Sequence, residues 1–396
     1  MVSGVNGAGA LAWTTTEKDG KLVSKSDAMT AISMRGAGYY SSNTAGAKAV
    51  IDRAGDLAAD ALGRMAPQRI GSPFSIADFG AADGGTSLDL MRRLIGQLRS
   101  RDASREITLT YTDLPHNDFC SLFRLTQGLL DGQTGTPLTD TEGLFIFGSG
   151  TSFYQQIVPT ETLSFGFSAT AMHWLSDRPC MIKDHVQAVG AAVHERDLFR
   201  ARALSDWQNI LLARARELRP GGKLVLANFC IDEGGRYLGA TGGVIMFDRF
   251  ARHWRDLVVA GRINETEYVN ATFQQFYKTV DEFVAPFNDR QSPVAQAGLT
   301  LNHLSTMVTG CPYAEAFGRR GDAVEFARAY VPTLRSWSET VFAGALDKSR
   351  SLPERAAIID DFYGAYQDEV ARAPEGHAMD YVHCLLEITK VAPRVS

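Results

Sequence analysis

A glycine-rich turn and an aspartate after the following strand are the residues of this sequence best suited to bind a ligand. The turn, Ala77–Ser87, reads ADFGAADGGTS and separates a β-rich run from a run with helical spacing. Gly80 and its neighbouring glycines allow the backbone to approach a ligand closely. In an open α/β sheet, ligands bind in the crevice at the carboxyl ends of the strands. A tight connection with no ligand would also explain the turn taken alone.

Asp113 ends the next expected strand and precedes Pro115. A carboxylate there can accept both hydroxyl protons of a ribose, although a helix cap or turn would use the same residue. The sequence has neither G-x-G-x-x-G nor G-x-x-x-x-G-K-[ST], which disfavours a dinucleotide or a nucleoside triphosphate. S-adenosylmethionine (SAM), which carries a nucleoside without a pyrophosphate, fits the two features together.

The sequence lacks the motifs for catalysis by a metal ion or by a serine nucleophile. The sequence has no H-E-x-x-H and no G-x-S-x-G, and its eight histidines do not cluster at metal-binding spacing. We therefore expect no metal site and no serine nucleophile. His173–Trp174 is the remaining aromatic and polar pair, and packing in the core would also explain it.

The composition limits which partners and which cellular compartment are expected for the chain. The chain has 396 residues and a net charge of −5, with basic and acidic residues intermixed. This balance predicts no nucleic-acid partner, and no apolar run is long enough to predict a membrane span. Five scattered cysteines favour free thiols in a reducing cytoplasm.

The pattern of elements predicts an α/β fold. Strands are expected at 74–79, 107–113, 144–147, 163–167, 224–229 and 380–389, with helices between the earlier ones. This alternation predicts a parallel sheet covered on both faces. From about 232 to 345 the pattern is helical and rich in aromatic residues, which predicts a mostly helical insertion.

Four segments, in order, resemble the SABATH carboxyl methyltransferases, known from plant methylation of salicylate, jasmonate, benzoate and indole-acetate. The resemblance extends from about residue 34 to the C-terminus and is weakest across the helical insertion. Its two most specific segments are D-L-P-H-N-D-F at 113–119 and H-W-L-S at 173–176. The H-W-L-S segment begins with T-S-F-Y at 151–154, which Pro159 follows, and the two remaining segments are Y-Y-S-S-N-T at 39–44 and the glycine turn.

The resemblance implies a Rossmann-like class I methyltransferase of the α/β class. It would have a mostly parallel seven-stranded sheet and a mostly helical cap insertion. We expect a mobile N-terminal tail at 1–30, a cofactor-binding core at 31–230, the cap at 231–345, and a return to the core with the last strand at 346–396. The resemblance also implies a homodimer whose substrate is a small carboxylic acid and whose product is its methyl ester.

Position by position, the resemblance also implies roles for residues. Asp113 would hold the ribose of SAM, and Trp174 would donate its indole N–H to the substrate carboxylate, with His173 beside it. Together with Gly80 of the turn, the residues implied at the cofactor are Tyr39, Asn43, Asp78, Asp83, Asp113, Leu114, Ser152, Phe153, Ser168 and Ala169. Those implied at the substrate are Met172, His173 and Trp174.

Two departures from the family pattern bear on the substrate. The plant enzymes hold the carboxylate with a Gln where this chain has Ala47, so His173, Tyr40 or the insertion must compensate. Thr170 stands where the family has an aromatic Tyr. These changes make the chain similar to a microbial branch that includes enzymes acting on fatty acids. An aliphatic acid is therefore favoured over an aromatic one.

The insertion has an apolar stripe that would cap the substrate. Met246, Phe247 and Trp254 lie on one helical face of this stripe, although core packing would produce the same spacing. We expect these three residues at the substrate.

A carboxylic acid with a pKa of about 4.3 is already ionised at neutral pH, so its methylation needs no general base. Trp174 and His173 would therefore position the substrate. Two alternatives remain open at this point: methylation of a phenol, amine or thiol with His173 as the base, and a cofactor-binding relative without catalytic activity.

Overall fold

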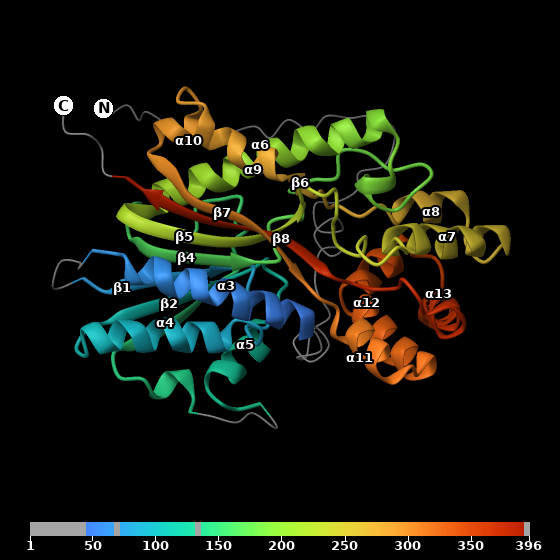
Figure 1. The fold of residues 1–396 in the computed structure, drawn as a ribbon, viewed down its shortest axis with the longest axis horizontal. Coiled ribbons are helices and arrows are strands. Elements are labelled where there is room, and N and C mark those ends of the chain that lie inside the picture. Colours follow the sequence, from blue (N-terminus) through green and yellow to red (C-terminus); the bar gives the residue numbers. More distant parts are fainter. Residues whose placement is uncertain (1–44, 67–71, 131–135, 392–396) are drawn as a thin grey trace, which may run out of the picture.

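A mixed β-sheet with helices on both faces organises the chain (Figure 1). The computed structural model describes residues 45–66, 72–130 and 136–391. The strands follow the order β3-β2-β1-β4-β5-β8-β7 across the sheet. Their bounds are β1 (Phe74–Phe79), β2 (Ile107–Thr112), β3 (Leu144–Ser149), β4 (Leu163–Ala169), β5 (Leu218–Ile231), β7 (Leu299–Thr309) and β8 (Tyr381–Lys390).

Most neighbours in the sheet are parallel, as predicted. The pairs among β1 to β5 are all parallel, whereas β8 is antiparallel to both β5 and β7. A short strand, β6 (Lys278–Thr279), adds a parallel pair at the end of β5. Parallel strands place their carboxyl ends along one edge, and the glycine turn and Asp113 therefore lie at neighbouring strand ends.

The central strands bury both of their faces. In β4, Phe165 and Phe167 point toward the helices α3 (Ala45–Gly63) and α4 (Leu88–Arg101). In β5, Val225 and Ala227 point to this same face, whereas Leu224 and Leu226 point to the other face, where Trp207 of α6 (Val193–Glu217) packs. Since successive side chains of a strand alternate between faces, a strand that is apolar throughout requires a layer of helices on each side.

The strand β7 was not predicted, because the whole range 231–345 was expected to be mostly helical. Its sequence, LTLNHLSTMVT, alternates poorly, and only its two end residues are buried. β7 lies at the edge of the sheet, where one side is open and the apolar signal of a buried strand is weak. Beside it lie α9 (Val280–Asn288) and α10 (Pro293–Gln296).

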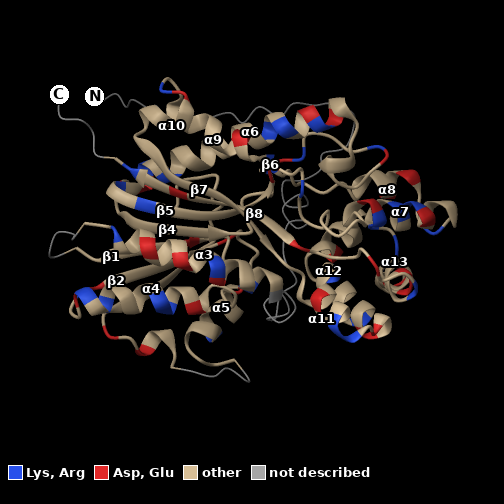
Figure 2. Ribbon diagram, viewed as in Figure 1, with Lys and Arg blue, Asp and Glu red and all other residues tan. Residues whose placement is uncertain are grey.

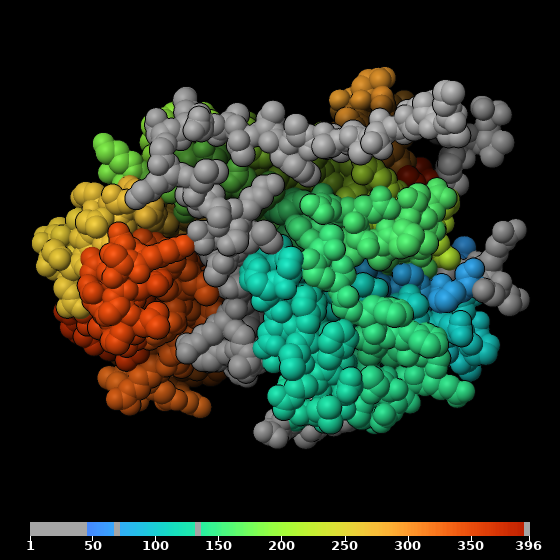
Figure 3. Space-filling view, turned by 180° about the vertical axis from the view of Figure 1, so that it is seen from behind, coloured from blue at the N-terminus to red at the C-terminus, as the bar shows by residue number. Residues whose placement is uncertain are grey.

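Except for α5 (Phe119–Thr126), which follows β2, the remaining helices form a cap beyond the carboxyl ends of the strands (Figure 1). They are α7 (Met246–Val259), α8 (Glu265–Asn270), α11 (Pro312–Arg320), α12 (Ala323–Ala345) and α13 (Leu352–Arg372). Figure 3 shows the cap, yellow to orange-red, at one end of the molecule and the chain around β1 to β3, blue to green, at the other. Because α13 packs on α12, the helical region continues past residue 345. The domain boundaries given above stay a prediction.

Aromatic side chains fill the interior of the cap. The rings of Phe342 and Phe362 lie 4.4 Å apart, and Trp254 lies 5.0 Å from Phe342. Phe250 stacks on Phe273 at 6.4 Å. Rings of this size bury large apolar areas and gain further from edge-to-face contacts. The cap therefore has a hydrophobic core of its own.

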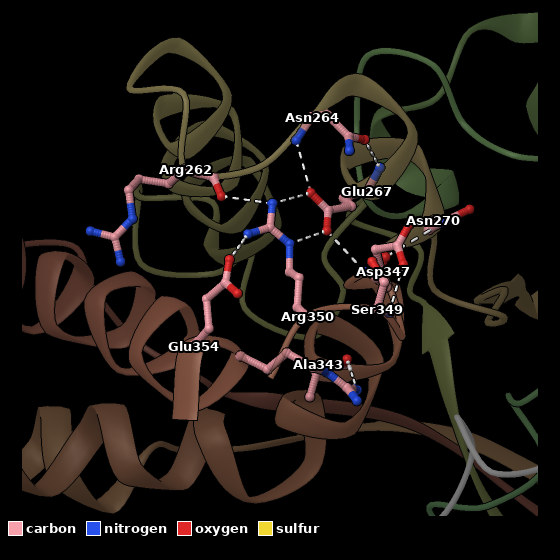
Figure 4. A network of polar contacts seen from close by, with 11 residues as sticks. Arg262, Asn264, Glu267, Asn270, Ala343, Asp347, Ser349, Arg350 and Glu354 are labelled. Carbon is pink, nitrogen blue, oxygen red and sulfur yellow. Dashed lines mark hydrogen bonds and ion pairs between the residues drawn. The ribbon is translucent and has the colours of Figure 1, made fainter. Parts of the chain in front are cut away.

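A buried carboxylate fastens the loops of the cap (Figure 4). Glu267 receives two hydrogen bonds from Arg350, at 2.6 and 2.9 Å, and the backbone N–H groups of Asn264 and Asp347 donate to the same carboxylate. These contacts hold the pKa of Glu267 below its usual value against the opposing effect of burial. The start of α8 is thereby tied to the α12–α13 connection.

Charged residues of both signs alternate over the outer helices (Figure 2). No helix within the described ranges combines the length and the apolar character needed to cross a bilayer.

Candidate functional site

The glycine turn leaves β1 with its backbone held against the end of β2. The N–H groups of Gly80 and Ala81 both donate to the carbonyl of Thr112, at 2.9 and 3.0 Å. Gly80 has a φ of +77°, and a Cβ there would lie 2.4 Å from the Cβ of Ala171. Ala82 also has a positive φ, +50°, which costs a non-glycine residue roughly 1–2 kcal/mol. The turn is therefore a tight, partly strained loop that touches the segment following β4.

Asp113 connects this turn to the end of β2. Its Oδ2 accepts the N–H of Ala82 at 2.8 Å, and its Oδ1 accepts the N–H of Leu114 at 2.7 Å. Asn117 donates to the carbonyl of Ala82 and completes the link. A carboxylate has about four acceptor positions, and these bonds use two of them. Burial raises the pKa of Asp113, although the two backbone hydrogen bonds oppose this.

Asp78, near the end of β1, provides a second carboxylate in the same crevice. It is buried, and Ser87 donates its hydroxyl to Oδ2 at 2.6 Å. Burial raises the pKa of Asp78, the Ser87 hydrogen bond lowers it and the nearby Asp113 raises it, with a net value of about 7. Asp83 lies in the turn itself, where its Oδ1 accepts the N–H of Gly85.

This pair of carboxylates fits a cationic ligand. Within the described part of the chain, neither Asp78 nor Asp113 forms an ion pair with a Lys or Arg side chain. Their mutual repulsion and burial leave a negative field that a bound cation would relieve. SAM carries a positive sulfonium and a positive ammonium group beside its ribose. The residues present therefore fit this cofactor.

A loop after β3 forms the next wall, and an ion pair inaccessible to solvent holds it. Arg214 and Glu217 of α6 pair at 2.6 Å with both side chains fully buried. Arg214 also donates to the carbonyls of Phe153 and Gln155, at 2.8 and 2.7 Å. The Phe153 ring comes within 3.9 Å of the Cβ position built at Gly80. Ser152 accepts the N–H of Gln155 through its carbonyl, and both predicted residues, Ser152 and Phe153, therefore lie in a fixed loop beside the turn.

The end of β4 contributes less to a ligand than expected. The Ser168 hydroxyl is buried and donates to the carbonyl of Phe79 at 2.7 Å, so it stabilises the sheet. Ala169 is partly exposed at the last position of the strand. The next residue, Thr170, has a φ of +60°, an outlier for a β-branched residue. Such strain is held by the surrounding structure and is common near functional sites.

An apolar pocket opens directly beyond Thr170. Its polar lining consists of Thr170, His173 and Gln275, and its other walls are Trp174, Phe229, Leu238, Tyr277, Trp337, Met379 and Tyr381. Its free volume is about 30 Å³, roughly the volume of one water in the liquid. Entry of an organic acid therefore requires the side chains around it to move.

His173 and Trp174 both line this pocket, as predicted. His173 is buried between Trp174, Phe229 at 4.8 Å and Tyr277 at 5.9 Å, and its Nδ1 has no hydrogen-bond partner in the described part of the chain. Burial lowers the pKa of His173 well below its usual value, and His383 lowers it further. The imidazole is therefore neutral near pH 7 and a weak proton acceptor.

Four predicted substrate residues lie elsewhere. Met172 points into the hydrophobic core on the α6 face of the sheet. Met246, Phe247 and Trp254 are fully buried in the cap, because the apolar face of α7 packs against α12 and α13. None of the four lines the pocket, and only Phe247 comes near it, behind Tyr277 at 6.2 Å. The prediction that they line the pocket was wrong, and core packing explains the stripe.

Tyr39, Tyr40 and Asn43 lie outside the described residues. Ala47, which stands where the family has a Gln, is buried on α3. Its neighbour Gly46 abuts Tyr381 of the pocket wall: a Cβ at Gly46 would lie 2.2 Å from that ring.

Several pocket residues were not predicted. Gln275, Tyr277, Trp337 and Tyr381 come from segments far from His173 in the sequence, and none belongs to a motif. Only long-range strand pairing and cap packing bring them together. The weak alternation near Tyr381 was the one available signal, and it indicated a strand without indicating a pocket.

A wider hollow on the outer surface of the cap does not offer a comparable site. It measures about 860 Å³ and lies between α7, α8 and the segment at 183–185. Four of its lining side chains pair with one another: Arg255 with Glu265 at 2.6 Å, and His185 with Asp248 at 3.3 Å. Across the described residues, no group of three or more His, Cys, Asp or Glu side chains could hold a metal ion.

Comparisons with known proteins agree with this geometry. Residues 29–390 match the family described as SAM dependent carboxyl methyltransferase. Methyltransferase FUS9 from Gibberella fujikuroi is 30% identical over 261 residues, covering 64% of this chain and 68% of that protein. Indole-3-acetate O-methyltransferase 1 from Arabidopsis thaliana is 25% identical over 289 residues, covering 67% and 71%. A solved structure, loganic acid methyltransferase with SAH, superposes with a TM-score of 0.72 at 19% identity, over 92% of this chain and 100% of that one. The fold is that of the α/β class I methyltransferases.

Proposed function

The chain belongs to the family of SAM-dependent carboxyl methyltransferases, and we propose that it methylates the carboxylate of a small apolar acid. Its cofactor is SAM, as in the family, and a methyl ester is the product that family membership implies. One observation carries the proposal: the carboxylate-lined turn and the apolar pocket are in contact. Gly80 of the turn contacts Ala171, which lies between the pocket residues Thr170 and Trp174.

On the cofactor side, we assign the ribose to Asp113 and the positively charged end of SAM to the region of Asp78 and Asp83. Two free acceptor positions on Asp113 suit the two hydroxyl groups of a ribose. Phe153 would cover the adenine, with Leu114 and Ser152 beside it. When bound, SAM supplies a methyl group on a sulfonium sulfur, from which a carboxylate oxygen can displace it.

On the substrate side, the residues of this chain orient the acid and exclude water. Trp174 is mostly buried, and its indole N–H has no acceptor among the described residues. A donor of this kind can hold one carboxylate oxygen in line with the methyl group. Correct positioning can supply roughly 7–11 kcal/mol of the barrier in well-oriented reactions.

The state of His173 favours a carboxylate over a phenol or an amine. A phenol with a pKa of about 10 must lose its proton before or during transfer. A base whose pKa is held well below its usual value removes that proton poorly. A carboxylate needs no such help, so His173 serves as part of the pocket wall.

The choice between an aliphatic and an aromatic acid is a narrower proposal. Thr170 in place of an aromatic residue favours an aliphatic chain. Phe229, Tyr277, Trp337 and Tyr381 nevertheless surround the pocket, and rings of this kind pack against chains and flat rings alike. We propose an aliphatic acid as the better substrate, to be tested by direct competition.

The test uses the purified protein with methyl-labelled SAM and a panel of octanoate, benzoate, indole-3-acetate, a phenol and an amine. The proposal predicts labelled product only with the acids, and release of the label by mild alkali, which cleaves an ester. Competition between octanoate and benzoate then compares their kcat/KM values. Transfer to the phenol or amine alone would overturn the proposal, and binding of SAM without any transfer would favour a non-catalytic relative.

The family resemblance also predicts a homodimer, and the scattered cysteines predict a location in the cytoplasm. Sedimentation of the purified protein and fractionation of its cells test these two expectations.

A further inference from the structure

The pocket contains a second hydrogen-bond donor beside Trp174, the side-chain amide of Gln275. We infer that Gln275 holds the substrate carboxylate together with Trp174 and supplies the contact that Ala47 cannot make. This inference rests on the proposed function, because it assumes that a carboxylate enters this pocket.

The backbone fixes Gln275 next to Trp174. These two residues form an isolated antiparallel bridge. The N–H of Leu175 donates to the carbonyl of Gln274 at 2.9 Å, and the N–H of Phe276 donates to the carbonyl of His173 at 3.0 Å. Because these bonds flank the pair, Trp174 and Gln275 face each other as a non-hydrogen-bonded pair. Side chains in such pairs point to the same side, with Cβ atoms roughly 4.5–5.5 Å apart.

Tyr277 sets the orientation of the amide. Its hydroxyl donates to Oε1 of Gln275 at 3.3 Å. Burial raises the pKa of Tyr277 well above its usual value, so the hydroxyl keeps its proton and remains a donor. With Oε1 engaged, the Nε2 group of Gln275 carries two N–H donors on the other side of the amide.

Both donors lack a protein acceptor. Gln275 is 1% exposed and Trp174 is 6% exposed. Among the described residues, none accepts a hydrogen bond from Nε2 of Gln275 or from the indole N–H of Trp174. Both residues line the pocket, so an acceptor that enters it can receive these hydrogen bonds, and a charged acceptor makes them stronger. An ionised carboxylate offers only acceptors, on two oxygens, so a substrate acid complements this pair of donors.

The test compares substitutions at Gln275 with one at its neighbour. Gln275→Met removes both donors and the acceptor for Tyr277. Gln275→Glu keeps an acceptor for Tyr277 and the same shape but replaces the donors with a like charge. Gln274→Met is the matched control, since Gln274 donates its amide to the carbonyl of Leu175 and lies outside the pocket lining.

With octanoate or benzoate as the probe, we expect kcat/KM to fall roughly 10- to 100-fold in Gln275→Met, the range for a hydrogen bond to a charged group. In Gln275→Glu at pH 8 the loss should be at least as large, because the two carboxylates repel. SAM affinity should stay within about twofold in all three variants, and Gln274→Met should retain its kcat/KM within roughly threefold. A residue that serves only the fold would be rescued by Glu and would change kcat/KM in parallel with thermal stability.

Calorimetry with the acid in the presence of S-adenosylhomocysteine separates this inference from the proposed function. Wild-type protein that binds the acid, with loss of binding in both Gln275 variants, supports the inference whether or not ester is formed. If the wild type forms esters and both variants match it, the inference is overturned and the proposed function stands. If the wild type neither binds nor methylates any acid of the panel, both are overturned.

Discussion

The glycine turn after β1 and the pocket under the cap meet at Ala171, but they are built in opposite ways. The turn takes its chemistry from two short stretches, 77–87 and 112–119, and backbone hydrogen bonds set its geometry. The pocket takes its walls from residues between Thr170 and Tyr381, and aromatic packing sets their positions. The comparison teaches that the turn and Asp113, where we propose that SAM binds, are marked by short local motifs, whereas the pocket proposed for the substrate depends on the tertiary structure. Substitutions should therefore separate the two sites.

The largest effect should come from Arg214, the anchor of the loop at 152–155. Arg214→Met leaves the buried Glu217 without its cation, with only the backbone N–H groups of Ile157 and Val158 as donors, and breaking such a pair typically costs about 3–5 kcal/mol. Urea unfolding measures this loss, and SAM affinity should fall with it because Phe153 loses its support. Arg200→Met is the control on the same helix: its pair with Glu282 leaves Arg200 exposed and should contribute at most about 1 kcal/mol. Equal losses in the two variants would show that the loop does not depend on the buried pair.

The next effect concerns pH and Asp78. Its pKa in the folded protein is about 7, above the ordinary value of 3.8. Between these values the folded state binds more protons than the unfolded state, so this group lowers stability as pH rises from about 4 to 7, after which its effect is constant. The stability of Asp78→Asn relative to the wild type, measured without SAM, should increase by roughly 4 kcal/mol over that range. If the stability difference between Asp78→Asn and the wild type does not change with pH, ionisation of Asp78 does not destabilise the folded state.

A smaller effect, confined to catalysis, is expected at Trp174. Trp174→Phe removes the indole N–H and keeps an aromatic wall. We expect kcat/KM for the acid to fall roughly 10- to 100-fold, with SAM affinity unchanged. Trp254→Phe provides the comparison: its indole N–H is buried in the cap and has no partner among the residues that the structure describes, so its loss should leave kcat/KM unaltered. Similar kcat/KM values for the two variants would mean that Trp174 does not bind the substrate.

The smallest effect should follow from Met246→Leu in the cap. Volume-conserving changes in a core usually cost less than about 1.5 kcal/mol, and Met246 does not line the pocket. The ranking of the acids in the panel should therefore be the same as in the wild type. A reversed preference between octanoate and benzoate would mean that α7 does help to form the substrate site.

The sequence predicted the first half of the molecule well for a physical reason. Strands β1 to β5 are buried on both faces, and their apolar runs and the turns between them are visible locally. The roles of Gly80 and Asp113 follow from their places at strand ends. β7 was missed because an edge strand has a weak apolar pattern. The stripe of Met246, Phe247 and Trp254 was misinterpreted because a helix that packs on other helices has the same periodicity as a helix that covers a ligand.

Gln275 could not have been found from its own surroundings. Nothing in the run Phe273–Tyr277 marks it as different from Gln274, which points elsewhere. Its significance arises from the bridge to Trp174 and the hydrogen bond from Tyr277, both of which require the folded chain.

The most direct measurement is the affinity for SAM of Asp113→Ala, determined by isothermal titration calorimetry on protein whose folding is confirmed by its thermal transition. Asp140→Ala, a change at the end of the short 3₁₀ turn Leu138–Asp140, serves as the control. We predict that the dissociation constant of Asp113→Ala rises at least roughly 100-fold, since two hydrogen bonds to a charged group are lost, while the control binds as the wild type does. Undiminished SAM affinity in a folded Asp113→Ala protein would contradict the assignment of the cofactor to the crevice between β1 and β2.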